Sequence, residues 1–511
     1  MSLDYRNIGV LFSLNTFNII LNVTYSTLTV YYFGTSAKVE AFFAATVLGT
    51  TVARFVQTGQ LMEIVIPRYH KVKQESGPKA AMSIVAMLAN FLTFTSLVLV
   101  LLLFAGGEMI HQLMVPGFEE VAKVEVLKIF YWTGLLMPVQ IATNLFQGML
   151  NAENIYGKVE LTNTLSLLVS IGLLSVWGGS IDALVVGLIL SIVAQFLTTV
   201  YYLKQIGYEH SFQLRNRFFS LRELFHSISA TSFYMVGVQV YIFIFNASLS
   251  LLPPGSYAIY RYAEVIYGKV ANVFMTPIST VFFNQINHLI NKNSAETVKS
   301  FVSQNLNFSY FMSFVVLLPF WAGGKLLIWT FWGGEKFTIS NVNSVYELLC
   351  IFFFTMICTG PYMIFRKLAI TVTHPELQYY YWGIMHMISA CLSYFLIRNL
   401  GFKGVMFQVF LHSFLMASVP FLTVLRKKRA YLGIYGATEV MKITLALVIG
   451  AVAGWKFNTF WNDADTYSKI TGFLIGTSAA LISGGVFISC CLLLKVHDIH
   501  LIQAKILKRI K

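Results

Sequence analysis

Long apolar segments separated by short polar ones run through the whole chain. A helix that crosses a lipid bilayer needs about 20 mostly apolar residues, because every backbone polar group must find its partner within the segment. Fourteen segments meet this condition, which predicts an all-α polytopic membrane protein with fourteen transmembrane helices. The predicted spans are residues 8–33, 38–66, 79–105, 124–150, 157–178, 181–203, 227–251, 256–288, 300–322, 346–368, 379–398, 402–424, 437–457 and 470–494.

The composition excludes the main soluble classes. Of the 511 residues, 57% are hydrophobic and only 11% are charged, whereas about 25% of residues are charged in an average soluble domain. The five cysteines all lie in apolar segments, without a Cys-x-x-Cys pair or a histidine at metal-ligand spacing. This pattern indicates buried, inert thiols. We therefore expect no metal and no cofactor.

The basic residues are distributed unevenly between the two sets of loops. If the N-terminus is cytoplasmic, 24 of the 36 lysines and arginines fall in cytoplasmic loops and tails, and nine fall in outside loops. Cytoplasmic loops of membrane proteins carry such an excess, so both termini are predicted to be cytoplasmic. The net charge of +14 is explained by attraction to anionic lipid, and we expect no nucleic-acid partner.

Two stretches of the chain resemble each other at a spacing of about 222 residues. Each combines an outside loop containing Gly and Glu, a helix with a central proline (Pro138 or Pro361), and a short polar inside turn. The repeat unit has six helices, so both copies keep the same orientation, as in transporters with two rocking halves. Chance similarity of apolar sequence is the alternative. The predicted domains are an N-lobe (1–205), a basic cytoplasmic linker (206–226), a C-lobe (227–425) and a C-terminal region with two further helices (426–511).

Charged side chains inside the predicted spans mark a candidate site, because burial in lipid is costly and such groups tend to face a cavity. Away from helix ends they are Arg54 in the second span and Arg261, Glu264 and Lys269 in the eighth. The repeat makes these two spans equivalent. Arginine binds phosphate through a bidentate fork and lysine through a point charge, so we expect a cationic cavity for an anionic headgroup such as a diphosphate. Mutual neutralisation of Arg261 and Glu264 is the alternative.

Polar side chains share one helix face in the first and seventh spans and form a slowly drifting stripe in the second, which extends the candidate cavity. Amide side chains recur at helical spacing within the first span and within the seventh. In the second span they lie close to Arg54. We expect these side chains to contact sugar hydroxyls. They are Asn15, Asn18, Asn22, Gln57 and Gln239.

Several short motifs together resemble one family of membrane transporters. They are Glu40-Ala-Phe-Phe-Ala-Ala45, Arg54, Ile66-Pro67, Gly117-Phe118, Met137-Pro138, Leu150-Asn151-Ala152, Tyr262-Ala263-Glu264 and Lys336-Phe337-Thr338. In this order they resemble the MurJ/MviN family of lipid II flippases, in the multidrug/oligosaccharidyl-lipid/polysaccharide (MOP) superfamily.

The resemblance implies a flippase without enzymatic activity. Its substrate would be a polyprenyl-diphosphate-linked saccharide, moved from the inner to the outer leaflet of a bacterial inner membrane by alternating access. The resemblance further implies that the last two helices form a groove for the lipid tail. We expect a monomer whose partners are this substrate and the bilayer.

One departure from the family pattern keeps alternatives open. Family members carry two arginines in the first helix, where this chain has residues such as Asn18 and Tyr25. The alternatives are an exporter of another lipid-linked oligosaccharide, such as an O-antigen or capsule unit, a small-molecule exporter, and a non-transporting scaffold for envelope assembly. The chain lacks a Gly-x-x-x-x-Gly-Lys-Ser/Thr loop, so it does not hydrolyse ATP by that device. The membrane potential, worth about 2.3 kcal/mol per charge per 100 mV, and coupling to an ion are both open as energy sources.

Overall fold

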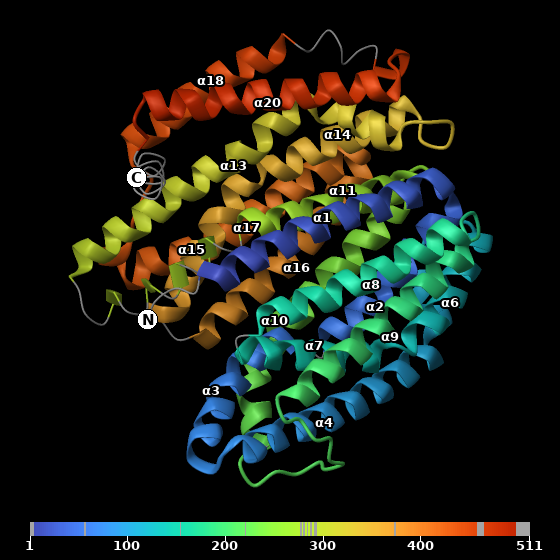
Figure 1. Ribbon diagram of the computed structural model, residues 1–511, viewed down its shortest axis with the longest axis vertical. Helices are drawn as coiled ribbons and strands as arrows, with labels where there is room; N and C mark the ends of the chain where they lie inside the picture. The colour runs from blue at the N-terminus through green and yellow to red at the C-terminus, as the bar shows by residue number, and fades with distance from the viewer. Residues whose placement is uncertain are drawn as a thin grey trace. The chain divides into compact units, whose positions relative to one another are not determined.

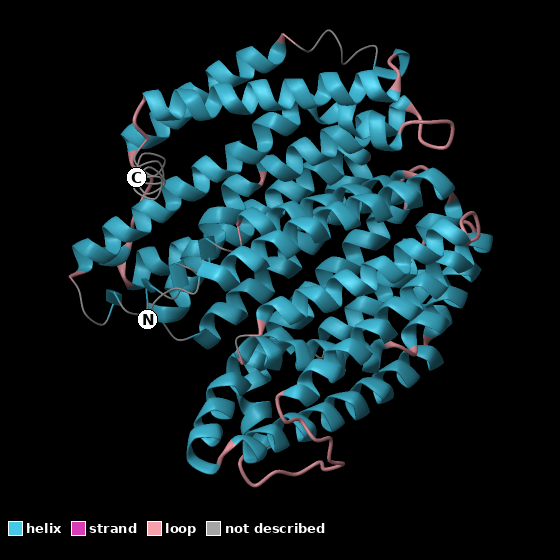
Figure 2. Ribbon diagram, in the orientation of Figure 1, coloured by secondary structure: helices cyan, strands magenta, loops and turns pink. Residues whose placement is uncertain are grey.

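The computed structural model describes residues 5–55, 58–153, 155–219, 221–275, 278–279, 282–283, 285–286, 289–290, 294–372, 375–456 and 464–496. Nearly all of these residues are helical, and within them two isolated bridges are the only β-structure (Figure 2). The all-α class predicted from the apolar segments is confirmed.

The chain divides into two compact units, which are described separately. The first consists of Met1–Ala258 and His386–Arg398, and the second of Ile259–Met385 and Asn399–Lys511. The first contains α1 (Tyr5–Phe33), α2 (Ala37–Phe55), α3 (Thr58–Ser76), α4 (Pro78–Ala105), α5 (Gly107–Met114), α6 (Glu120–Gly134), α7 (Met137–Ala152), α8 (Tyr156–Val176), α9 (Ile181–Gln205) and α10 (Leu221–Ser250).

The second unit holds most of the remaining helices, and two of them cross the boundary between the units. Those two are α11 (Ser256–Phe274) and α16 (Pro375–Leu400). The others are α13 (Ala295–Trp332), α14 (Ile339–Phe354), α15 (Met356–Val372), α17 (Phe402–Lys427), α18 (Ala437–Trp455) and α20 (Lys469–Leu493), with short 3-10 helices at Arg429–Tyr431 and Ala464–Thr466.

The helices of the described residues are sufficient for a multi-pass membrane protein. Ten stretches of helix are long and apolar enough to cross a bilayer, and α6 with α7 makes an eleventh if the bent pair is one span. The number fourteen and the cytoplasmic position of both termini stay predictions.

Proline explains where the fourth predicted span bends. Residues 124–150 were expected to form one helix, but α6 and α7 meet at an angle of 50°. Pro138 is the second residue of α7, and Gly134 is the last residue of α6. A proline ring clashes with the carbonyl four residues earlier and donates no hydrogen bond to it. The helix therefore ends at Gly134 and restarts around Pro138.

The first unit has a continuous apolar core where α3, α4 and α7 pack together. Tyr69, Ile84, Met87 and Leu145 are fully buried there. Burial of each such side chain contributes about 1.5–3 kcal/mol relative to exposure. This core fixes the ends of α3 and α7 relative to each other, and so positions the polar groups that these ends carry.

The second unit is held together by close backbone packing among α13, α18 and α20. Figure 1 shows α18 and α20 side by side, and α20 contacts α13 along its length. A Cβ atom added at Gly323 would lie 2.0 Å from the carbonyl oxygen of Gly476. Small residues at helix interfaces permit this kind of approach in membranes, where apolar surfaces gain little by leaving lipid.

Candidate functional site

Three of the predicted site residues have side chains outside the described part of the structure. The backbones of Asn15 and Arg54 lie in α1 and α2, but their side chains are not described, and Gln57 falls outside the described residues altogether. Their roles stay predictions. The other six predicted residues are described, and they lie on α1, α10 and α11.

The two oppositely charged residues of α11 form an ion pair. A guanidinium Nη of Arg261 contacts a carboxylate oxygen of Glu264, one helical turn further on. The Arg261 side chain is 10% exposed and that of Glu264 is 42% exposed. The guanidinium also lies 5.4 Å from the centroid of the Tyr260 ring. The neighbouring carboxylate and ring hold the buried arginine in one orientation, while Lys269 on the same helix is exposed.

Two of the predicted amides on α1 are hydrogen-bonded within the protein. Asn18 is buried, and its Nδ2 donates to Oε2 of Glu160 on α8 at 3.2 Å. Its Oδ1 accepts from the hydroxyl of Thr164 at 2.7 Å. Asn22 donates to the backbone carbonyl of Asn18 at 2.6 Å. Asn18 therefore joins α1 to α8, and contact of either asparagine with sugar hydroxyls stays a prediction.

A polar network that the sequence analysis missed continues from this point into α7 and α9. Asn163 on α8 accepts hydrogen bonds from Gln195 of α9 at 2.6 Å and from Gln147 of α7 at 3.3 Å. It donates to Oε2 of Glu160 at 3.3 Å. Gln147 also donates to Thr162 at 2.9 Å. The signal in the sequence was Glu160 three residues before Asn163, a spacing that places both on one helix face.

Gln239 on α10 differs from these amides. It is 6% exposed, and neither its Oε1 nor its Nε2 has a hydrogen-bond partner among the described residues. A buried polar group without a partner costs about 1–3 kcal/mol. Of the described residues predicted to bind substrate, Gln239 is thus the amide whose donor and acceptor both lack a partner in the described part of the chain.

At the outer end predicted for the second span, Glu40 caps the first turn of α11. Its Oε1 accepts hydrogen bonds from the backbone N–H groups of Tyr257 at 3.0 Å and Ala258 at 3.2 Å. Glu40 is 5% exposed, and Tyr257 in turn donates from its hydroxyl to Oδ1 of Asn246 on α10 at 2.8 Å. A carboxylate at a helix N-terminus satisfies free donors and complements the helix dipole. Glu40 therefore joins α2 to the turn between α10 and α11.

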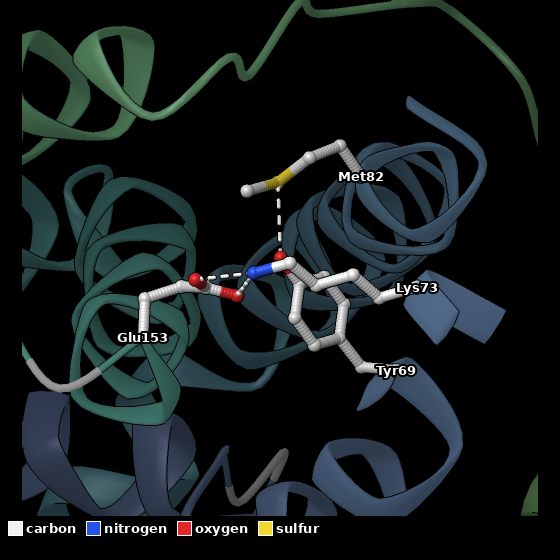
Figure 3. Close-up of polar contacts among 4 residues, drawn as sticks. All are labelled: Tyr69, Lys73, Met82 and Glu153. Carbon is white, nitrogen blue, oxygen red and sulfur yellow. Dashed lines mark hydrogen bonds and ion pairs between the residues drawn. The ribbon is translucent and has the colours of Figure 1, made fainter. Parts of the chain in front are cut away.

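An ion pair joins α3 to the C-terminal end of α7. The Lys73 ammonium donates to both carboxylate oxygens of Glu153, at 2.7 and 2.6 Å (Figure 3). Tyr69 lies beside the pair, with its hydroxyl 3.9 Å from the sulfur of Met82. Burial alone would raise the pKa of Glu153, but hydrogen bonds from Lys73 and Tyr69 outweigh it and lower that pKa.

The comparisons with known proteins identify the family. The model of a family described as lipid II flippase MurJ matches residues 29–475. The chain belongs to the MurJ lipid II flippase family. No curated protein sequence matches the chain.

Solved structures show that the fold is that of MurJ and its superfamily. A lipid II flippase MurJ in an inward closed conformation has a TM-score of 0.71 at 18% identity, over 94% of this chain and 100% of its own. An inward-facing multidrug resistance MATE family transporter of the MOP superfamily scores 0.64 at 14% identity, over 82% of this chain and 98% of its own. A MOP superfamily transporter from Pyrococcus furiosus scores 0.57 at 15% identity, over 83% and 95% of the two chains.

Membership in the MurJ family makes this chain a membrane transporter, a flippase, rather than an enzyme. Among the described residues no three His, Cys, Asp or Glu side chains gather as metal ligands would.

Proposed function

We propose that this MurJ family member moves lipid II from the inner to the outer leaflet of a bacterial inner membrane. The observation that carries the proposal is the match of the family model over residues 29–475, which covers most of the chain. The substrate then consists of an apolar polyprenyl tail, a diphosphate and a saccharide. Each part requires a different surface from the protein.

The proposed transport unit has fourteen spans, cytoplasmic termini and two six-helix lobes that alternate in access. The excess of basic residues in the cytoplasmic loops supports the orientation, and the repeat around Pro138 and Pro361 supports the two lobes. The last two helices would hold the lipid tail. Oligomeric state is proposed to be monomeric, with the substrate and the bilayer as partners.

In the proposed site, Arg54, Arg261 and Lys269 bind the diphosphate. The contact between Glu264 and Arg261 supports a positioning role for Glu264, because the carboxylate holds the guanidinium in place on α11. Arginine is suited to this role because its guanidinium binds phosphate through N–H groups in a fixed planar fork. Gln239 is the described amide that best fits a contact with the saccharide, because neither its donor nor its acceptor has a partner among the described residues.

The alternatives are less consistent with the family match. An exporter of an O-antigen or capsule unit would use the same chemistry but would not be expected to match a lipid II flippase model over residues 29–475. A non-transporting scaffold would gain nothing from keeping Arg261, a cation that is 8% exposed, within a membrane helix.

The test is lipid II transfer in cells that depend on this chain. Depletion should leave lipid II in the inner leaflet, protected from an added membrane-impermeant lipid II hydrolase. Arg54→Ala or Lys269→Ala should abolish transfer at unchanged membrane abundance. Lys403→Ala, which removes an exposed lysine at the start of α17, is the matched control and should transfer normally.

Two outcomes would contradict the proposal in different ways. If another glycolipid accumulates on depletion, the proposed substrate is wrong, but the protein is still a flippase. Full transfer by the double variant Arg54→Ala with Lys269→Ala would contradict the proposal that these cations bind the diphosphate.

A further inference from the structure

An apolar groove with a volume of about 480 Å3 lies on the surface of the first unit, and none of the residues assigned to transport lines it. It is lined by α4, α7, α9 and the segment that follows α9. Ala89, Thr93, Phe94 and Leu97 line it from α4, and Phe196 from α9. The volume is within the usual range for sites that bind small molecules.

The surface around the groove is the kind that faces lipid. On α4, Phe94 is 62% exposed and Leu101 is 57% exposed, and on α9 Leu197 is 59% exposed. Exposed apolar side chains in a row along a membrane helix contact acyl chains rather than water. The groove therefore opens toward the bilayer, and an apolar chain from the membrane can enter it directly.

One end of the groove is polar and cationic. Lys204, in the last turn of α9, lines it and is exposed, and its ammonium has no hydrogen bond or ion pair among the described residues. His210 lines the same end and is also exposed. The Nδ1 of His210 lies 3.0 Å from the hydroxyl of Tyr208. Burial raises the pKa of Tyr208 to about 12. In the tautomer in which the Tyr208 hydroxyl donates to Nδ1, the Nε2–H of His210 can donate to a ligand.

The segment after α9 is fixed over this end by hydrogen bonds to α4. Nδ2 of Asn90 donates to the backbone carbonyls of Ser211 at 2.8 Å and Gln213 at 3.1 Å. Between these two residues, Phe212 is 87% exposed. An exposed apolar ring beside the end of a membrane helix can insert at the boundary between headgroups and acyl chains.

From this arrangement we propose that the groove binds an anionic phospholipid, with an acyl chain along α4 and α9 and the phosphate at Lys204 and His210. The cationic end of the groove and its apolar lining favour a ligand with both an anionic headgroup and a long apolar chain. Phe212 inserts beside the headgroup. With the proposed orientation of the chain, the lipid belongs to the cytoplasmic leaflet. The site is independent of the residues proposed to bind lipid II.

The proposal is tested by lipid retention in native mass spectrometry. The full chain is purified from nanodiscs of dioleoylphosphatidylcholine containing dioleoylphosphatidylglycerol. We expect one phosphatidylglycerol to be retained in preference to phosphatidylcholine. Lys204→Gln should lower this retention about fivefold, because one basic residue at an anionic membrane surface contributes about 1 kcal/mol. Lys427→Gln, at the exposed end of α17, is the control and should retain the lipid.

A second pair of variants tests the groove itself. Thr93→Trp fills the groove and should abolish retention, whereas Thr95→Trp, two residues along the same helix and outside the lining, should not. Equal retention by all four variants would overturn the proposal, as would equal retention of the two lipids. Displacement of the bound lipid by inorganic phosphate alone would show an anion site without an acyl-chain groove. Lipid II transfer by Lys204→Gln is measured separately, so failure of this proposal leaves the proposed transport function intact.

Discussion

The two units of the chain pack their helices through different contacts, side-chain hydrogen bonds in the first and backbone contacts at glycines in the second. In the first, α1, α7, α8 and α9 meet through side chains, and Asn163 contacts Glu160, Gln147 and Gln195 by hydrogen bonds. In the second, α13, α18 and α20 meet through glycines, and Gly323 touches the backbone of Gly476. Neither helix set relies on the apolar effect alone, which is weak between helices surrounded by lipid.

The difference predicts different sensitivities. A backbone contact leaves no space for a side chain, so its response to substitution should be steep and insensitive to pH. A network of amides around one carboxylate can lose a member and adjust the others, so its response should be graded. The predictions below separate these two behaviours, beginning with the largest effect.

Gly323→Ala should cause the largest loss of stability. The added methyl group would lie 2.0 Å from the carbonyl oxygen and 2.9 Å from the carbonyl carbon of Gly476, and backbone atoms cannot rotate away as a side chain can. Overpacking of this kind costs about 1–3 kcal/mol or more. We expect a clear drop in the melting temperature of the detergent-solubilised protein. Gly485→Ala on α20, where a Cβ meets nothing within 4 Å, should melt like the unchanged protein, and equal melting of both variants would refute close packing of α13 and α20.

Asn163→Leu should destabilise the first unit by a smaller amount. Leucine is similar in size but leaves the amides of Gln147 and Gln195 without the acceptor that they share. Interhelical hydrogen bonds in membranes contribute about 0.6 kcal/mol each on average, so the loss should be about 1–2 kcal/mol. The measurement is again thermal melting, with Thr198→Val on α9 as the control, because that hydroxyl bonds only to its own helix. A variant as stable as the control would show that the network carries no stability.

The ion pair of Lys73 and Glu153 should make the first unit sensitive to acid. A carboxyl whose pKa is lowered by folding stabilises the protein above its ordinary pKa, about 4.3. That contribution is lost as the pH falls through the lower pKa of the folded state. The melting temperature should therefore fall below about pH 5 in the unchanged protein and less so in Glu153→Gln. Glu75→Gln is the matched control, since its 3.8 Å pair with Lys71 is about 60% exposed on both sides and such pairs contribute little. Identical acid profiles for Glu153→Gln and the unchanged protein would contradict this role.

The sequence predicted the helices and the family better than the contacts between helices. Apolar segments and motifs such as that around Glu40 depend on local order, and the all-α class and the family follow from them. Asn18 was identified as polar within a span, but its bond to Glu160 depends on how α1 packs on α8, which periodicity does not contain. The contact of Gly323 with Gly476 was not predicted for the same reason, because it depends on how α13 packs on α20. The bend at Pro138 was present in the sequence as a proline, and only its effect on the helix was underestimated.

Substitution of Gln239 should have the smallest effect on stability. Unlike the substitutions of Gly323 and Asn163, it should not destabilise the protein. The two polar atoms of Gln239 are buried without partners among the described residues, so Gln239→Leu removes an uncompensated polar group and should leave stability unchanged or raise it by up to about 1 kcal/mol. If the amide serves the saccharide, the same variant should lower lipid II transfer at normal abundance, and Gln239→Asn should restore part of it. Gln378→Leu is the control for packing, since Gln378 is also buried on a membrane helix but was not predicted to bind substrate. A Gln239→Leu protein that melts lower and transfers normally would assign Gln239 to packing, like Asn163, and leave α10 without a contact to the cargo.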